Sequence, residues 1–259
     1  QHRRVKPVNS ETVECEINWT RRFDHMQQHS GQHLLSAVFS ERFNLDTIGF
    51  HLGDRVSTLD LNTGALSDGQ LREVEERANE IVAENRPLLV VYEDAASAEG
   101  LRKESDREGT LRIVTIEDLD RSACGGTHVR ATGEIGLVQI RKTEKIRGDN
   151  RIEFLCGRRA VRRARADFDC LTKVARVFSA QLDETPDLVA AQQQKLAEAG
   201  KARKHLAREV AGMRGRELYQ SAQADANGLR MVVRRLDQGS AGEDLRSEAQ
   251  AFAANSRAV

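Results

Sequence analysis

The sequence is poor in several residue types, and each shortage argues against a class of protein. Of its 259 residues only 4% are aromatic and three are proline, whereas 31% are charged. This balance suits long solvated helices better than a β-sandwich. There is no secretory segment and no apolar run long enough to span a bilayer. We therefore expect no membrane partner.

Paired cysteines and net charge are also missing. The four cysteines lack paired spacing and predict no disulfide framework, so a reducing, cytoplasmic location fits best. Lys and Arg total 40, as do Asp and Glu, so only local clustering could argue for nucleic-acid binding. The length allows one large domain or two modest ones, and we favour two. Because the chain opens with Gln1 rather than Met, we expect a fragment.

Two short clusters carry the chemistry: His29-Ser-Gly-Gln-His33 and Cys124-Gly-Gly-Thr-His128. Residues four apart on a helix share a face, so His29 and His33 can point at one ion. The glycine pair predicts a turn that bends Cys124 and His128 toward a common atom. Nitrogen and sulfur ligands favour zinc over magnesium or calcium. We predict one zinc ion, bound by these four residues.

Each cluster taken alone has a simpler interpretation. A helical histidine pair is weak evidence, and a lone cysteine is more often a core residue than a ligand. Both clusters together, in a chain with seven histidines, favour the metal site. His25 remains open as a ligand, a support for a ligand or a polar residue near a helix start. His51 is interpreted as structural.

Hydrophobic periodicity predicts alternating strands and helices up to residue 156. A strand is expected over Thr12–Trp19, and then a helix capped by Thr20 that runs to Phe43 and carries His29 and His33. Gly31 within it indicates either a close backbone approach or tolerated drift. The other predicted elements are a hairpin over 48–62, a helix from a Ser67 cap to Arg86, a buried strand over Leu88–Tyr92, a strand over Leu111–Ile116, and a hairpin over 136–156 that turns at Gly148-Asp149.

The chain becomes helical after Gly157. Helices are predicted over 160–182 and 186–226, with a break and N-cap at Asp183–Thr185. Uneven leucine spacing favours an antiparallel helical hairpin over a long coiled coil. A strand over Leu229–Leu236 and a helix to Ala254 indicate the start of a small α/β module. The predicted class is α+β: an antiparallel sheet with helices on one side, followed by the helical hairpin and the start of the α/β module.

Several motifs, in this order, resemble the editing domain of alanyl-tRNA synthetases. They are His29-x-x-x-His33-Leu-Leu, Gly49-Phe-His-Leu-Gly53 with the following Ser57-Thr-Leu-Asp60, and Cys124-Gly-Gly-Thr-His128. The stretch from Arg21 to His29 more closely resembles free-standing long-form alanyl-tRNA editing proteins. Arg151-Ile-Glu-Phe-Leu-Cys-Gly157 and the helices after it resemble the join to their DHHA1 region. An upstream Gly-Gly-Gly-Gln-Pro motif of long-form members does not occur here.

The resemblance implies a synthetase-like editing domain at 1–156, a helical hairpin at 157–226 and a partial DHHA1-like module at 227–259. It also implies deacylation of alanine tRNA that carries serine or glycine, with zinc on His29, His33, Cys124 and His128. Four protein ligands normally describe a closed site. The zinc would therefore either expand to five-coordinate or mainly shape the pocket.

Some residues are predicted to contact the substrate. Gln32 and Thr127 are candidate catalytic contacts to water or substrate, although an ordinary structural hydrogen bond explains either of them equally well. Thr47, Gly125 and Gly126 are candidate substrate-binding residues, the glycines through backbone amides.

Local basic clusters provide the argument for RNA that the net charge does not. Candidate tRNA contacts are Arg141, Lys142, Lys145, Arg162 and Arg163. The alternative for the arginines is a solvated helix face paired with nearby acids. The expected partner is alanine tRNA, and any oligomer is expected to form through the C-terminal region.

Three functional classes remain open from the sequence. The favoured one is a free-standing aminoacyl-tRNA hydrolase. The second is the editing and C-terminal portion of an alanine-tRNA ligase. The third is a non-catalytic RNA-binding protein that uses zinc only for folding.

Overall fold

A computed structural model describes residue 12 and residues 14–233 and 242–258. The chain divides into two compact units, Gln1–Asp169 and Cys170–Val259. Helices and antiparallel strands make up the first unit, so the predicted α+β class is confirmed. The division between the units falls within α3 (Arg158–Phe178), and the three-part division at residues 156 and 226 remains a prediction. None of the described helices has the length and apolar character that crossing a bilayer requires.

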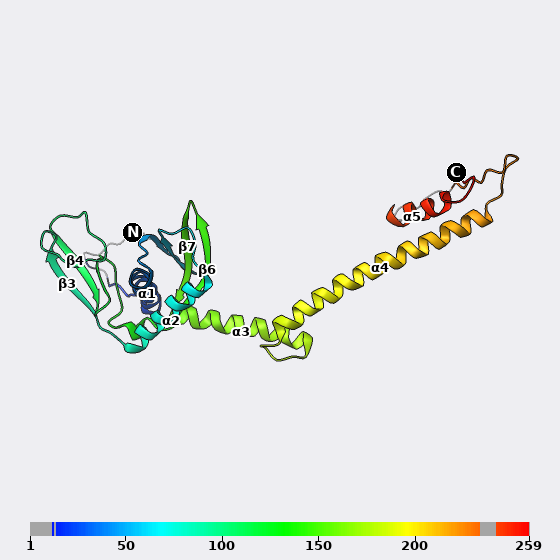
Figure 1. Cartoon of the computed structure of the whole chain (residues 1–259). Helices are drawn as coiled ribbons and strands as arrows, with labels where there is room; N and C mark the ends of the chain where they lie inside the picture. Colours follow the sequence, from blue (N-terminus) through cyan, green and yellow to red (C-terminus); the bar gives the residue numbers. More distant parts are fainter. Residues whose placement is uncertain (1–11, 13, 234–241, 259) are drawn as a thin grey trace. The chain divides into compact units, whose positions relative to one another are not determined.

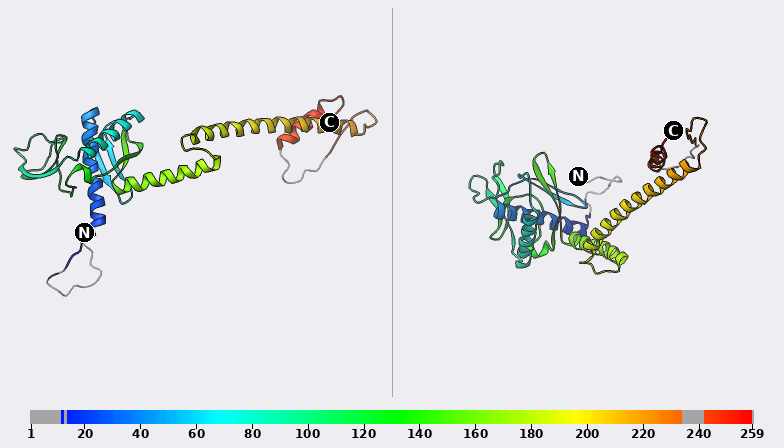
Figure 2. Two further views of the ribbon diagram at one scale, coloured as in Figure 1. Left: turned by 90° about the horizontal axis from the view of Figure 1, so that it is seen from below. Right: turned by 45° about the vertical axis from the view of Figure 1, so that its right-hand side comes forward.

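Helix α1 (Trp19–Phe43) lies between two antiparallel sheets in the first unit, as Figures 1 and 2 show. The four-stranded sheet has the order β1-β2-β7-β6, and the three-stranded sheet has the order β3-β4-β5. The remaining elements are β1 (Thr47–Leu52), β2 (Ser57–Leu61), α2 (Asp68–Glu84), β3 (Leu88–Asp94), β4 (Thr110–Ile116), β5 (Asp120–Ala123), the 3-10 helix η1 (Thr132–Glu134), β6 (Val138–Ile146) and β7 (Asp149–Cys156).

One face of the four-stranded sheet forms the main core. Leu59 of β2 and Phe154 of β7 are fully buried on it, against Phe39 of α1 and Ile81 of α2. Helices α1 and α2 therefore cover this face of the sheet, as expected for strands in which apolar and polar residues alternate. Both predicted hairpins are confirmed, and the second turns at Arg147 and Gly148, whose φ angles are 51° and 100°. Ser67 caps α2 in a capping box with Gln70, as predicted for Ser67.

The three-stranded sheet corrects one expectation and adds a strand that was not predicted. β3 is not a buried strand: residues 89–92 are all exposed, and Tyr92 is 68% exposed. An apolar run of this length has no periodicity that separates a buried strand from a strand at a sheet edge. The sequence reading missed β5, which pairs with β4 and leads straight into Cys124.

The expected strand over Thr12–Trp19 is also wrong within the described residues. Residues 14–18 are exposed and form no ladder, and Trp19 begins α1 instead of ending a strand. Asn18, not Thr20, caps the helix, because its side chain accepts a hydrogen bond from the Arg21 amide at 3.0 Å. The end of the helix at Phe43 is as predicted, with Asn44 in the left-handed conformation that closes helices.

The second unit consists mainly of α4 (Thr185–Ser221) packed against α5 (Gly242–Ala253), side by side in Figure 2. The ring centroids of Tyr219 and Phe252 lie 5.9 Å apart. The predicted strand at Leu229–Leu236 is wrong for its described part, where Arg230 makes only isolated bridges. A single strand has no neighbours with which to build a ladder. Residues 234–236 lie outside the described residues, and the helical hairpin remains a prediction.

Gly31 of α1 lies directly against the side chain of Cys156, which leaves no room for a side chain at residue 31. A Cβ atom on Gly31 would lie 2.1 Å from the Cys156 sulfur of β7. Cys156 is fully buried, and burial raises the pKa of its thiol. The neighbouring Gln28 donates to the Cys156 carbonyl at 3.0 Å and accepts from its amide at 2.9 Å. Close approach, not drift, explains the glycine.

Gly31→Ala should therefore destabilise the protein by about 1–3 kcal/mol through overpacking. Alanine has the higher helix propensity, by about 0.5–1 kcal/mol, so only the contact with Cys156 can cause the loss. Urea unfolding should show that the loss disappears when Gly31→Ala is introduced into Cys156→Ala. An equal loss in both backgrounds would contradict this explanation.

Candidate metal centre

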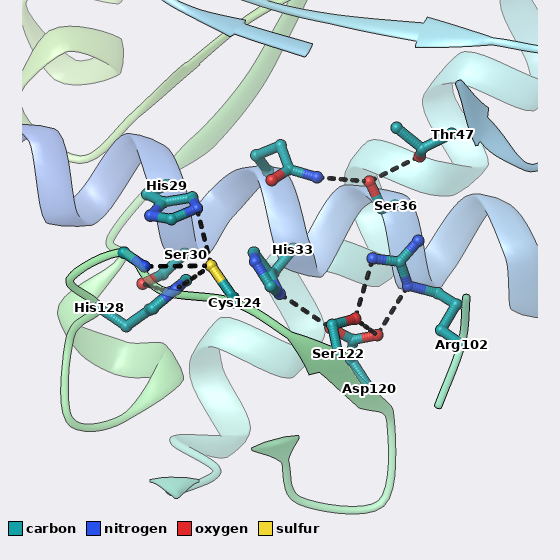
Figure 3. A network of polar contacts seen from close by, with 12 residues as sticks. His29, Ser30, His33, Ser36, Thr47, Arg102, Asp120, Ser122, Cys124 and His128 are labelled. Atoms are coloured by element: carbon teal, nitrogen blue, oxygen red, sulfur yellow. Dashed lines mark hydrogen bonds and ion pairs between the residues drawn. The ribbon is translucent and has the colours of Figure 1, made fainter. Parts of the chain in front are cut away.

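Four side chains from the two sequence clusters meet at one point. Donor atoms of His29, His33, Cys124 and His128 all lie within 4.8 Å of one another. The Cys124 sulfur is 3.5 Å from His29 Nε2 and 3.4 Å from His128 Nε2 (Figure 3). Helix α1 supplies one pair, and the segment after β5 supplies the other. His25 is not in this group; it lies 3.5 Å from Asp54 instead.

The distances and the chemistry of this group both suit a metal ion. Tetrahedral zinc bonds of about 2.0–2.3 Å place neighbouring ligand atoms about 3.5 Å apart. Burial acts against the Cys124 thiolate, but hydrogen bonds from the three imidazoles and the Gly126 amide outweigh it and lower the Cys124 pKa to about 3. Burial lowers the pKa of His128 to about 4. A thiolate and a neutral imidazole are the forms that bind metal.

A buried carboxylate orients His33. Asp120 Oδ2 accepts from His33 Nδ1 at 3.0 Å, which leaves Nε2 for the ion. Arg102 donates to Asp120 Oδ1 at 2.7 Å, and Ser122 donates to both carboxylate oxygens at 3.0 Å. Burial raises the pKa of Asp120, but His33 and Arg102 outweigh burial and hold it below its usual value. The carboxylate therefore stays ionised beside the imidazole.

Contacts to the other ligands fix the rest of the centre. Ser30 Oγ accepts from the Val129 amide at 3.1 Å and lies 3.2 Å from His128 Nδ1. This hydrogen bond directs His128 Nε2 toward the sulfur. The ring of His29 packs against Gly126, where a Cβ atom would lie 2.1 Å from His29 Cε1. A side chain at residue 126 would therefore collide with the His29 ring. The Gly126 amide also donates to the Cys124 sulfur at 3.4 Å.

A cavity of about 460 Å³ opens beside the ligand group, and His29, His33 and Cys124 line it. Of the predicted substrate contacts, Gln32, Thr47 and Gly125 line it. Thr127 faces a different hollow, which it shares with His25, and Gly126 is occupied with His29 and the sulfur. The structure therefore places three of these predicted residues at the cavity and two away from it.

The predicted RNA contacts gather at a second cavity of the first unit. Arg141, Lys142, Arg162 and Arg163 line it, whereas Lys145 does not. Asp167 accepts from both Arg141, at 2.6 Å, and Arg163. Within the described part of the chain Arg162 has no carboxylate partner. The acid-paired alternative thus describes Arg163, and Arg162 keeps an uncompensated charge.

Sequence reasoning missed Asp120, Ser122, Arg102 and Ser30. A signal existed for the first two, since Asp120, Ser122 and Cys124 are spaced two residues apart and would share a face of an extended segment. Arg102 comes from a loop and Ser30 sits between the histidines in sequence. Neither has a spacing that indicates its role.

Comparison with known proteins shows which proteins the chain resembles. A profile described as "Threonyl and Alanyl tRNA synthetase second additional domain" matches residues 111–153, which include Cys124 and His128. The chain is 32% identical to alanyl-tRNA editing protein AlaX-L of Pyrococcus horikoshii, over 70% of this chain and 44% of that protein. It is 30% identical to Aarsd1, an alanyl-tRNA editing protein of Danio rerio, over 77% of this chain and 50% of that protein.

The chain is a homologue of alanyl-tRNA editing proteins. It also matches an alanine–tRNA ligase of Pyrococcus abyssi at 33% identity, over 68% of this chain and 20% of the ligase. The chain thus spans half or less of the length of these curated relatives. The predicted resemblance to alanyl-tRNA editing proteins is confirmed.

Asp120→Asn should weaken zinc binding about 10–100-fold, because the neutral amide orients and polarises His33 less than a carboxylate does. Competition with a chromophoric zinc chelator measures the affinity directly. Asp118→Asn, in the exposed turn before β5, is the matched control and should leave the zinc affinity unchanged. Equal affinities for all three proteins would show that Asp120 does not act on the centre.

Proposed function

We propose that the chain hydrolyses the ester of alanine tRNA that carries serine or glycine, with one zinc ion held by His29, His33, Cys124 and His128. The observation that carries this proposal is a complete ligand set, three members of which, His29, His33 and Cys124, line a cavity. The cavity volume lies within the range of about 300–1,000 Å³ that is usual for ligand pockets. The relatives named alanyl-tRNA editing proteins support the reaction class and tRNA as the partner.

The zinc, when bound, would act as a Lewis acid on the ester carbonyl. The chain's own groups position the rest of the substrate. The Gly126 amide already donates to the Cys124 sulfur, so the Gly125 amide is the proposed donor to the developing oxyanion. Phe50 lines the cavity, is half-exposed and stacks on His29 with 6.1 Å between ring centres. Its open face can receive the terminal base of the tRNA.

Cys124→Ala should lower deacylation of seryl-tRNA at least 100-fold, because it removes the thiolate that the three imidazoles surround. The measurement is release of labelled serine from mischarged alanine tRNA, alongside zinc content by atomic absorption. Cys170→Ala, at an exposed cysteine of the second unit, should retain both zinc and activity.

The same experiment separates the non-catalytic alternative. A chain that uses zinc only for folding would release no serine in either form. Equal hydrolysis by the parent and Cys124→Ala would contradict zinc-dependent editing.

We propose that the basic cavity around Arg162 holds phosphates of the tRNA. Arg162→Glu combined with Arg163→Glu should weaken tRNA binding about tenfold at low salt and reduce the dependence of binding on salt. Filter binding over a salt series measures both. Arg72→Glu, an exposed reversal on α2, is the control. Unchanged affinity of the double variant at low salt would remove this assignment.

The ligase match favours a second candidate: that this sequence is the editing and C-terminal portion of an alanine–tRNA ligase. The deacylation chemistry would be the same. Class II synthetase motifs upstream in the full gene would decide for the ligase.

A further inference from the structure

Gln32 has an unsatisfied hydrogen-bond acceptor beside the metal ligands. Its side chain lines the cavity and is only 3% exposed. Gln32 Nε2 donates to Ser36 Oγ at 2.9 Å, whereas Gln32 Oε1 is buried and has no hydrogen-bond partner among the residues that the structure describes. Buried polar atoms are nearly always hydrogen-bonded, and an orphan atom is costly. An orphan acceptor in the wall of a ligand cavity indicates a ligand that donates a hydrogen bond there.

The other end of the amide is anchored. Ser36 Oγ receives a second hydrogen bond, from Thr47 Oγ1 at 2.7 Å (Figure 3). Thr47 belongs to β1 and also lines the cavity, so α1 and β1 together hold the Gln32 amide. With its nitrogen engaged by Ser36, the amide keeps its oxygen as an acceptor. An amide oxygen can only accept a hydrogen bond.

Gln32 also lies on the same face of α1 as the metal ligands. His29, Gln32, His33 and Ser36 follow the spacing i, i+3, i+4, i+7. A group bound next to the ion therefore lies within reach of the Gln32 side chain. The side chain of an aminoacyl ester bound there would lie beside Gln32.

We propose that Gln32 Oε1 accepts a hydrogen bond from the side-chain hydroxyl of a seryl ester, and so makes Gln32 a specificity-determining residue. This inference rests on the proposed deacylase function. Serine supplies the donor, whereas the alanine methyl group would leave the acceptor buried and unpaired. A site built to bond a hydroxyl rejects an analogue that lacks it. Glycine also lacks the hydroxyl, so the same acceptor ranks serine above glycine.

The test replaces Gln32 with residues of similar size that cannot accept the bond. Gln32→Leu and Gln32→Met should each lower kcat/KM for seryl-tRNA about 10–100-fold and leave kcat/KM for glycyl-tRNA within about twofold. Gln139→Leu is the matched control. Gln139 also has a buried, unpartnered Oε1, but it lies on β6 and not at the cavity, so serine preference should persist.

A binding measurement gives a readout apart from turnover. Calorimetry compares 3′-deoxy-3′-(serylamino)adenosine with its alanylamino counterpart, two amides that resist hydrolysis. The parent chain should prefer the seryl compound, and both Gln32 variants should bind the two equally. Zinc content and circular dichroism of each variant establish that the centre and fold persist.

Two results would overturn the assignment. An equal loss on seryl- and glycyl-tRNA would show that Gln32 contacts a group common to all esters, such as the α-ammonium, or only supports the fold. A seryl preference retained by both variants would place selection elsewhere. Failure of the proposed function is distinct, because the parent chain itself would then release no amino acid from any mischarged tRNA and bind neither adenosine compound.

Discussion

The Cys124 sulfur joins two segments that are far apart in the sequence. It lies within hydrogen-bonding distance of His29 on α1 and of His128 in its own turn, and the Gly126 amide also donates to it. A buried thiolate is costly unless such donors, or a metal, surround it. The Cys124 sulfur therefore helps to hold α1 against the segment after β5, together with the contacts of Ser30 and His33.

The metal ligands can meet only if α1 has the correct rotation, which the opposite side of the helix sets. Gln28 makes two hydrogen bonds to the backbone of Cys156, and Gly31 lets the cysteine sulfur sit against the helix. These contacts hold α1 against β7. A helix turned by one residue would lose both bonds and rotate His29 and His33 away from Cys124. The packing of α1 therefore sets the rotation that brings the candidate metal ligands together.

The sequence predicted what depends on local periodicity and missed what depends on neighbours. The i, i+4 histidines, the Ser67 cap and both hairpins follow from spacing, and the structure contains them. The exposure of β3 could not be predicted, since an apolar run does not reveal which side of a sheet it will face. Arg102 was missed because its pairing with Asp120 joins a loop to a strand. Residues 14–18 alternate like a strand but have no strand beside them.

One stripe of α1 carries both the candidate metal ligands and the proposed specificity residue, and this limits how the site can change. His29 and His33 face the metal position, while Gln32 and Ser36 continue the same stripe toward β1. Any shift of α1 along its axis that altered the metal geometry would also move the Gln32 amide relative to Thr47. A change at Ser36, by contrast, would free that amide without touching a ligand. The positions of the candidate metal ligands therefore depend on the helix backbone. The orientation of the unpaired Gln32 acceptor depends instead on the hydroxyl groups of Ser36 and Thr47. A change at these hydroxyl groups would alter substrate preference without altering the metal ligands.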